Sequence, residues 1–159
     1  MVIKMVDLYR FKQLILNDGS YFNKKVIKDS SDEIIIEAYE NWGSFSTTIY
    51  ISCDRYGLAQ VEFVTTPSAN KSPEFFDADC DLRFYLSRFS DRNNLFMING
   101  KTINGKMHYS LLFNDRTLRN NINNADDAFR YCIEALNCFT NTSVRYYLDK
   151  VVSALRKVN

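Results

Sequence analysis

Histidine and cysteine are the side chains that most often serve as general bases and nucleophiles, so they are the first candidates for chemistry. The chain has one histidine, His108, and four cysteines at positions 53, 80, 132 and 138. A cysteine-dependent enzyme would pair His108 with Cys132 or Cys138. Cys132 shares an apolar helical stripe, and burial keeps a thiol protonated. Cys138 lies off that stripe and is therefore the better candidate nucleophile.

Sequence motifs for catalysis and metal binding are missing. The chain contains no G-x-S-x-G, H-E-x-x-H, Walker A, G-x-G-x-x-G or C-x-x-C pattern. The run Asp77-Ala-Asp79-Cys-Asp81 resembles the start of a calcium loop, but Leu82 and Arg88 occupy the positions that require Gly and Glu. We interpret Asp79 or Asp81 as a helix cap instead. The sequence predicts no catalytic residue, no metal site and no cofactor.

Lysines form two small groups that could contact phosphates. Lys24, Lys25 and Lys28 lie in a β-like run, and Lys101 and Lys106 flank a predicted hairpin tip. Lysines on edge strands more often prevent aggregation than bind phosphate. The formal net charge is only +1, so no global field attracts nucleic acid or anionic lipid. We expect neither nucleic acid nor a membrane as a partner.

Aromatic residues are the most unusual part of the composition. Twelve Phe, ten Tyr and one Trp make up 14% of the chain. Two adjacent aromatic residues cannot both face the same core, so one of each such pair remains available for contacts. On this basis Phe75 and Phe76, in a predicted loop, and Tyr146, on the last helix, are the candidate protein-binding residues. Tyrosine suits interfaces because it combines a large contact area with a polar tip.

These residues must be positioned by a single α+β domain covering residues 1–159. Asp7 is expected to cap a helix that starts at Leu8 and ends at Asp18-Gly19, where glycine would supply a positive φ. Residues 21–64 alternate with period two between turn-rich segments, which predicts a meander of four antiparallel strands. A second helix is expected to follow the cap at residue 79 or 81 and to end at residues 91–94. The helices should cover one face of the sheet.

The second half of the chain predicts a hairpin and a helical end. Asn104-Gly105 favours a type I′ turn, which would pair Ile98 with Leu111 and Phe96 with Phe113. A helix is expected to start at residue 124 or 126. Residues 140–142 can break it, although the absence of Gly and Pro between residues 125 and 158 also permits one kinked helix.

The order of these elements resembles that of the YbjN family and of the type III secretion chaperone-like fold. The resemblance is carried by Asp18-Gly-Ser-Tyr-Phe22, by Asn93-Asn94 before a strand at 96–98, and by the strand 109–113 that leads into a helix at 126–139. It implies a non-enzymatic module that binds other polypeptides, often as a dimer.

We therefore expect a protein-binding module without activity of its own, chaperone-like or regulatory, which covers the surface of another protein. A homodimer is one arrangement that this hypothesis includes. The segment 1–7 is too short an apolar run for a signal sequence, which favours a cytoplasmic protein. We also expect a bacterial or phage protein. Two alternatives remain: an immunity or anti-defence inhibitor of a toxin or nuclease, and the cysteine-dependent enzyme.

Overall fold

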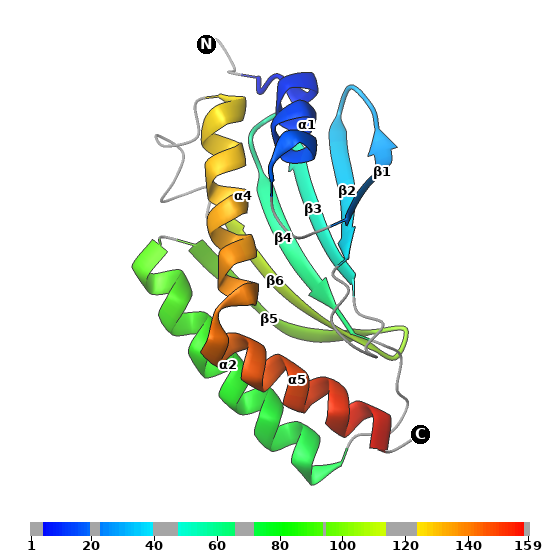
Figure 1. The fold of residues 1–159 in the computed structure, drawn as a ribbon, viewed down its shortest axis with the longest axis vertical. Helices are drawn as coiled ribbons and strands as arrows, with labels where there is room; N and C mark the ends of the chain where they lie inside the picture. Colours follow the sequence, from blue (N-terminus) through cyan, green and yellow to red (C-terminus); the bar gives the residue numbers. More distant parts are fainter. Residues whose placement is uncertain are drawn as a thin grey trace.

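The computed structural model describes residues 5–19, 23–39, 48–65, 72–93, 95–113 and 124–157, and these form an α+β fold (Figure 1). In chain order the elements are α1 (Leu8–Asn17), β1 (Asn23–Asp29), β2 (Glu33–Tyr39), β3 (Thr48–Asp54), β4 (Ala59–Val64), α2 (Pro73–Asn93), β5 (Leu95–Ile103), β6 (Lys106–Phe113), α4 (Ala125–Thr140) and α5 (Thr142–Lys157). None of the helices in these ranges has the length and hydropathy needed to cross a bilayer. The predicted fold class is confirmed.

The six strands form one sheet in the order β1-β2-β3-β4-β6-β5, and each neighbouring pair is antiparallel. The first four strands are the predicted meander. Burial alternates along them: Ile49, Ile51 and Cys53 of β3 are buried, whereas the residues between them are partly exposed. Successive side chains of a strand point to opposite faces, so one face of the sheet packs against the helices.

The helices lie on that face in two groups (Figure 1). α4 packs on β4, where Phe139 stacks on Phe63 with ring centroids 5.8 Å apart, and it also contacts α1. α2 and α5 pack against each other, and α2 also contacts β5. The Tyr109 hydroxyl of β6 donates a hydrogen bond of 2.5 Å to the carboxylate of Asp79 on α2. The four helices within the described ranges therefore share a single hydrophobic core with the sheet.

α1 begins as predicted and ends differently. The Asp7 carboxylate accepts a hydrogen bond from the backbone N–H of Arg10, which is an ordinary N-cap. Gly19 does not have the positive φ that we predicted. The Nζ of Lys24 instead donates to the carbonyl oxygens of Ile15 and Asp18, at 2.8 and 2.9 Å. The Lys24 ammonium group, from β1, therefore supplies hydrogen-bond donors to carbonyl oxygens at the end of α1. In a glycine C-cap, backbone N–H groups would supply these donors.

α2 begins earlier than predicted. Its first residue is Pro73, and the Ser72 hydroxyl accepts from the backbone N–H of Phe75 at 3.2 Å. Proline suits the first position of a helix because it has no N–H to leave unpaired. The predicted cap at Asp79 or Asp81 is therefore wrong, since both residues lie inside the helix.

The β5–β6 turn is confirmed at Asn104-Gly105. Their φ angles of 52° and 77° are both positive, as a type I′ turn requires, and Ile103 pairs with Lys106 across it. Glycine adopts such an angle without steric cost, and asparagine tolerates it better than most residues. This local signal needed no tertiary information.

The register beyond the turn differs from the prediction by one residue. An irregularity between Ile98 and Lys101 shifts the pairing, so Ile98 lies opposite Ser110 and Met97 lies opposite Leu111. A bulge adds one residue to one strand and moves every later pair. Phe96 likewise lies opposite Leu112, so the predicted pairings of Ile98 with Leu111 and of Phe96 with Phe113 are both wrong.

Two helices, rather than one kinked helix, form the carboxyl-terminal part of the described chain. Asn124 caps α4 by accepting from the N–H of Asp127 at 2.9 Å. Asn141 ends α4 in an extended conformation, and its side chain accepts from the N–H groups of Ser143 and Val144. One asparagine therefore both interrupts the helical backbone and caps α5, which lets α5 turn back toward α2.

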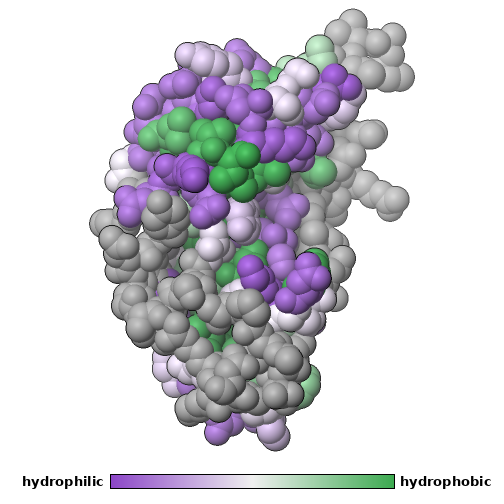
Figure 2. Space-filling view, turned by 90° about the vertical axis from the view of Figure 1, so that its right-hand side faces the viewer, coloured by the Kyte–Doolittle hydropathy of each residue, from purple (hydrophilic) through white to green (hydrophobic). Residues whose placement is uncertain are grey.

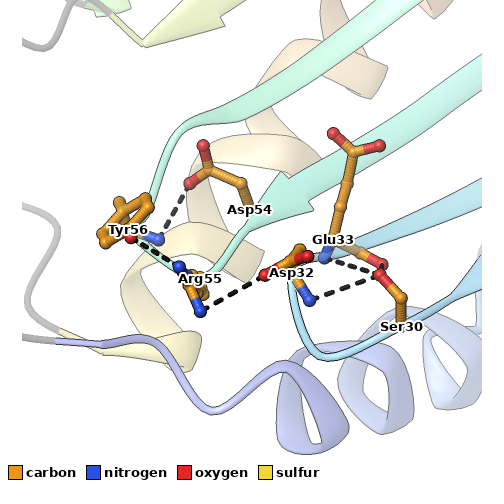
Figure 3. A network of polar contacts seen from close by, with 6 residues as sticks. All are labelled: Ser30, Asp32, Glu33, Asp54, Arg55 and Tyr56. Atoms are coloured by element: carbon orange, nitrogen blue, oxygen red, sulfur yellow. Dashed lines mark hydrogen bonds and ion pairs between the residues drawn. The ribbon is translucent and has the colours of Figure 1, made fainter.

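Two turns are joined at one end of the sheet (Figure 3). The Ser30 hydroxyl accepts from the backbone N–H groups of Asp32 and Glu33 in the β1–β2 turn. Arg55, in the β3–β4 turn, lies 3.2 Å from the Asp32 carboxylate and also donates to the Tyr56 hydroxyl. The contacts order the two turns relative to each other without forming a catalytic arrangement.

Candidate functional site

A polar cluster lies on the sheet face opposite the helices. His108 and Ser110 of β6 lie beside Glu62 of β4, which is the register partner of Ser110. The Ser110 hydroxyl donates to Oε2 of Glu62 at 2.8 Å, and Nδ1 of His108 lies 3.1 Å from Oε1. Nδ1 is buried and, within the described part of the chain, has no aligned hydrogen bond, so its contact with Glu62 is a close approach only.

The arrangement of the three groups does not activate a nucleophile. In a Ser-His-Asp triad the imidazole lies between the hydroxyl and the carboxylate, and it accepts the hydroxyl proton. Here the Glu62 carboxylate lies between His108 and Ser110, and it accepts the hydrogen bond of the Ser110 hydroxyl itself. These contacts tie β4 to β6, and we assign them a structural role.

The structure does not bring His108 together with the candidate cysteines. Cys53, Cys132 and Cys138 are buried in the core beneath the helices, on the other side of the sheet from His108. Burial raises the pKa of Cys53 to about 12 and also raises the pKa values of Cys132 and Cys138. The prediction that Cys138 lies off the buried surface is wrong, because α4 is covered by the sheet, α1 and α5. Cys80 is exposed on α2.

The three carboxylates at positions 77, 79 and 81 point in different directions because they lie in a helix. Asp79 faces inward, where it accepts from Tyr109 and lies 3.1 Å from the guanidinium of Arg83. Asp77 and Asp81 are four residues apart and share an exposed face of α2. The described residues contain no group of three side chains that could hold a metal ion.

A groove of about 440 Å³ lies between α2 and α5. The charged and aromatic residues that line it are Glu74, Asp77, Asp81, Tyr146, Asp149 and Lys150. The groove walls therefore carry four carboxylates and one ammonium group. Asp149 is paired with Arg145 of the same helix at 3.2 Å. The carboxylates give the groove an acidic character, although the whole chain is close to neutral.

A row of four aromatic rings, which we call the aromatic row, crosses from α2 to α5 beside this groove. It runs Phe84, Tyr85, Tyr147, Tyr146, with successive ring centroids 5.5, 4.8 and 5.1 Å apart. The two inner rings are partly buried and stacked, whereas Phe84 and Tyr146 are 56% and 54% exposed. Each exposed ring therefore packs edge to face against one ring of the stacked inner pair.

Lys150 lies at the end of the aromatic row. Its Nζ is 4.6 Å from the centroid of the Tyr146 ring and 5.9 Å from that of Tyr147. The pKa of Lys150 is raised, mainly by its side-chain interaction with Tyr146 and further by Tyr147 and Asp81. The groove therefore already stabilises one cation against an aromatic face.

The three predicted contact residues have different positions in the structure. Phe75 is 1% exposed and belongs to the core, so its prediction as a loop contact is wrong. Phe76 is 57% exposed on α2, and Tyr146 lines the groove. Sequence reasoning missed Phe84 as a contact, although Phe84-Tyr85 is an adjacent aromatic pair of the same kind. Whether Phe75 or Phe76 faces the core depended on where α2 begins.

The predicted lysine cluster is divided by the fold. Lys24 is buried at the end of α1, Lys28 lies 3.3 Å from Glu33, and Lys25 is exposed on the edge strand β1. Figure 2 shows the β1–β2 side of the molecule, where an apolar patch is surrounded by hydrophilic residues. The exposed apolar residue of β1 is Ile27, 45% exposed, between Lys25 and Lys28. Flanking lysines on an edge strand are typical of protection against sheet-to-sheet pairing.

No protein-family model, curated protein or solved structure matches this chain. The resemblance to the YbjN family stays a prediction, and the function must be argued from the surface itself.

Proposed function

We propose that this protein is a protein-binding module that contacts its partner through the surface formed by α2 and α5. The observation that carries the proposal is the aromatic row, whose outer rings are exposed while its inner rings are held by the core. Exposed aromatic residues beside a groove are typical of interfaces.

The energetics favour a role for these rings in binding. Burying an exposed aromatic side chain contributes about 1.5–3 kcal/mol, and a few such anchors supply most of the free energy of an interface. The stacked Tyr85 and Tyr147 limit the motion of Phe84 and Tyr146 before the partner arrives. Anchors that are already positioned lose less conformational entropy on binding.

The polar groups elsewhere support binding rather than catalysis. The Ser110 hydroxyl donates its hydrogen bond to Glu62 and not to His108. The cysteine-enzyme hypothesis depended on Cys132 or Cys138, and both are buried thiols on the other side of the sheet from His108.

Site-specific photocrosslinking in cells tests the proposal. A benzophenone amino acid would replace Phe84 or Tyr146, and in matched controls it would replace Tyr9 or Tyr56, which are 67% and 57% exposed elsewhere on the molecule. We expect the same protein to be crosslinked from positions 84 and 146 and not from positions 9 and 56. Crosslinks that come equally from all four positions, or only from the control positions, would refute the proposal.

A quantitative test follows once the crosslinked protein is purified. We expect Phe84→Ala to weaken binding by at least about tenfold, which corresponds to 1.4 kcal/mol, and Tyr9→Ala to leave the dissociation constant unchanged. Equal affinities for the two variants would contradict the proposed surface. If the partner is an enzyme, a loss of its activity in the complex indicates an inhibitor, and retained activity indicates a chaperone-like module. Crosslinks to a second copy of the chain would identify a homodimer.

A further inference from the structure

The groove between α2 and α5 is lined mainly by negative charges, which favour a cation as its ligand. Asp77 and Asp81 lie one helical turn apart on α2, and Asp149 lies across the groove on α5. Like charges on one wall repel each other, and each is hydrated when the groove is empty. A positive group between the two helices would relieve this repulsion.

The aromatic wall of the groove favours the same class of ligand. Tyr146 presents a ring that is 54% exposed, and the Lys150 ammonium already lies over it. An ammonium or guanidinium group over an aromatic face is attracted by the ring quadrupole. Lys150 is itself exposed, so a cation that binds on this ring would take the place of its ammonium group.

The dimensions fit a side chain rather than a metal ion. A volume of about 440 Å³ is far larger than a bare ion requires and lies in the range of clefts that hold small organic groups. Asp77, Asp81 and Asp149 also do not belong to a metal-binding cluster within the described chain. Arginine fits best, since its planar guanidinium can stack on a ring and donate to two carboxylates at once.

We propose that the groove binds a basic segment of a protein partner, with an arginine or lysine side chain between Asp77, Asp81 and the ring of Tyr146. This inference rests on the proposed function, because it names the chemistry of the partner at the same surface. The aromatic row provides apolar contact, and the acidic groove selects a partner with positive charge.

Fluorescence anisotropy with a defined peptide tests this inference directly. The probe is a labelled Arg-Ala repeat peptide, and the matched control peptide carries neutral citrulline in place of each arginine. The protein is the full chain, as wild type, as Asp77→Asn/Asp81→Asn, and as the control Asp29→Asn/Asp32→Asn. Both double variants remove two negative charges, but Asp29 and Asp32 lie at the β1–β2 turn. A general effect of net charge would therefore act equally on both.

We expect the arginine peptide to bind the wild type and the citrulline peptide not to bind. The groove variant should bind the arginine peptide about tenfold more weakly, and the control variant should bind it as the wild type does. Equal weakening in both double variants, or equal binding of the two peptides, would overturn the inference.

A second variant acts by filling the groove. Ser153→Arg adds a guanidinium from α5, at a partly exposed position that lines the groove. We expect this variant to lose peptide binding to a similar extent, because its own arginine competes for Asp77 and Asp81. Peptide binding that is unchanged in Ser153→Arg would also overturn the inference.

The two proposals fail in different ways. If positions 84 and 146 crosslink a partner but Asp77→Asn/Asp81→Asn binds that partner with unchanged affinity, the proposed function stands and the basic segment is wrong. If the crosslinks come only from positions 9 and 56, the proposed function is wrong, whatever the peptide does.

Discussion

Replacing Lys24 by methionine tests whether a buried ammonium group ends α1. Its Nζ donates to the carbonyl oxygens of Ile15 and Asp18 and lies 3.5 Å from the Asp18 carboxylate. The side chain is 5% exposed, so water has little access to the site. Methionine keeps a similar unbranched stem and removes only the charge and the donors.

The expected loss of stability can be worked from these contacts. A hydrogen bond that involves a charged group contributes about 1.5–3 kcal/mol, and a cation at a helix carboxyl terminus adds at most about 2 kcal/mol. Methionine also avoids the desolvation cost of burying the Lys24 ammonium group, and this gain offsets part of the lost stability. We therefore expect Lys24→Met to lower the free energy of unfolding by about 2–3 kcal/mol.

The neighbouring Lys25→Met is the matched control for this measurement. Lys25 is exposed on the same strand, and a surface substitution of this kind changes stability by at most about 0.5 kcal/mol. Urea denaturation measures both variants, and hydrogen exchange in the last turn of α1 should accelerate only in Lys24→Met. The reasoning is refuted if the two variants lose equal stability, or if Lys24→Met loses less than about 0.5 kcal/mol.

Four further predictions concern the core, the thiols and the hairpin. Tyr109→Phe removes the hydrogen bond to Asp79 and should cost about 2 kcal/mol by urea denaturation, whereas an unchanged midpoint would contradict the role of that bond. Burial and Asp79 raise the pKa of Tyr109, so the wild type should lose stability as the pH rises above the unfolded value of about 10, and Tyr109→Phe should lose less of it. Iodoacetamide should label only Cys80 in the native protein, as mass spectrometry can show, and labelling of a second thiol would mean that the core opens readily. Gly105→Val should lower the melting temperature more than Gly100→Val, because Gly105 has a φ of 77° and such a position costs a β-branched residue about 1 kcal/mol or more; the reverse order would place the turn elsewhere.

The local signals of the sequence determined the elements of the fold. Asp7 caps the helix that it was expected to cap, and Asn104-Gly105 forms the turn. Asn124 caps α4 and was one of the two starts, residue 124 or 126, that the sequence left open. Alternation between apolar and polar residues predicted the four-strand meander, and the order of strands and helices predicted a sheet covered on one face. These features depend on neighbours within a few residues, so the sequence contains the information needed to infer them.

Positions that depend on distant segments could not be inferred in this way. Lys24 has the same sequence context as a surface lysine, and only the approach of β1 to the end of α1 gives it a buried role. Phe75 is buried and Phe76 is exposed because α2 begins at Pro73, which places both residues in a helix. Cys138 is buried because α4 is covered by other elements as well as by the sheet.

The groove is likewise a product of the tertiary structure. Asp77 and Tyr146 are far apart in the sequence, and neither the acidic run nor the adjacent tyrosines predict a cleft. The break at Asn141 lets α5 return along α2, and the stacking of Tyr85 on Tyr147 sets the two helices side by side. The sequence determined that aromatic and acidic side chains would remain outside the core. Only helix packing decided that they would meet in one groove, because packing depends on contacts between residues that the chain separates widely.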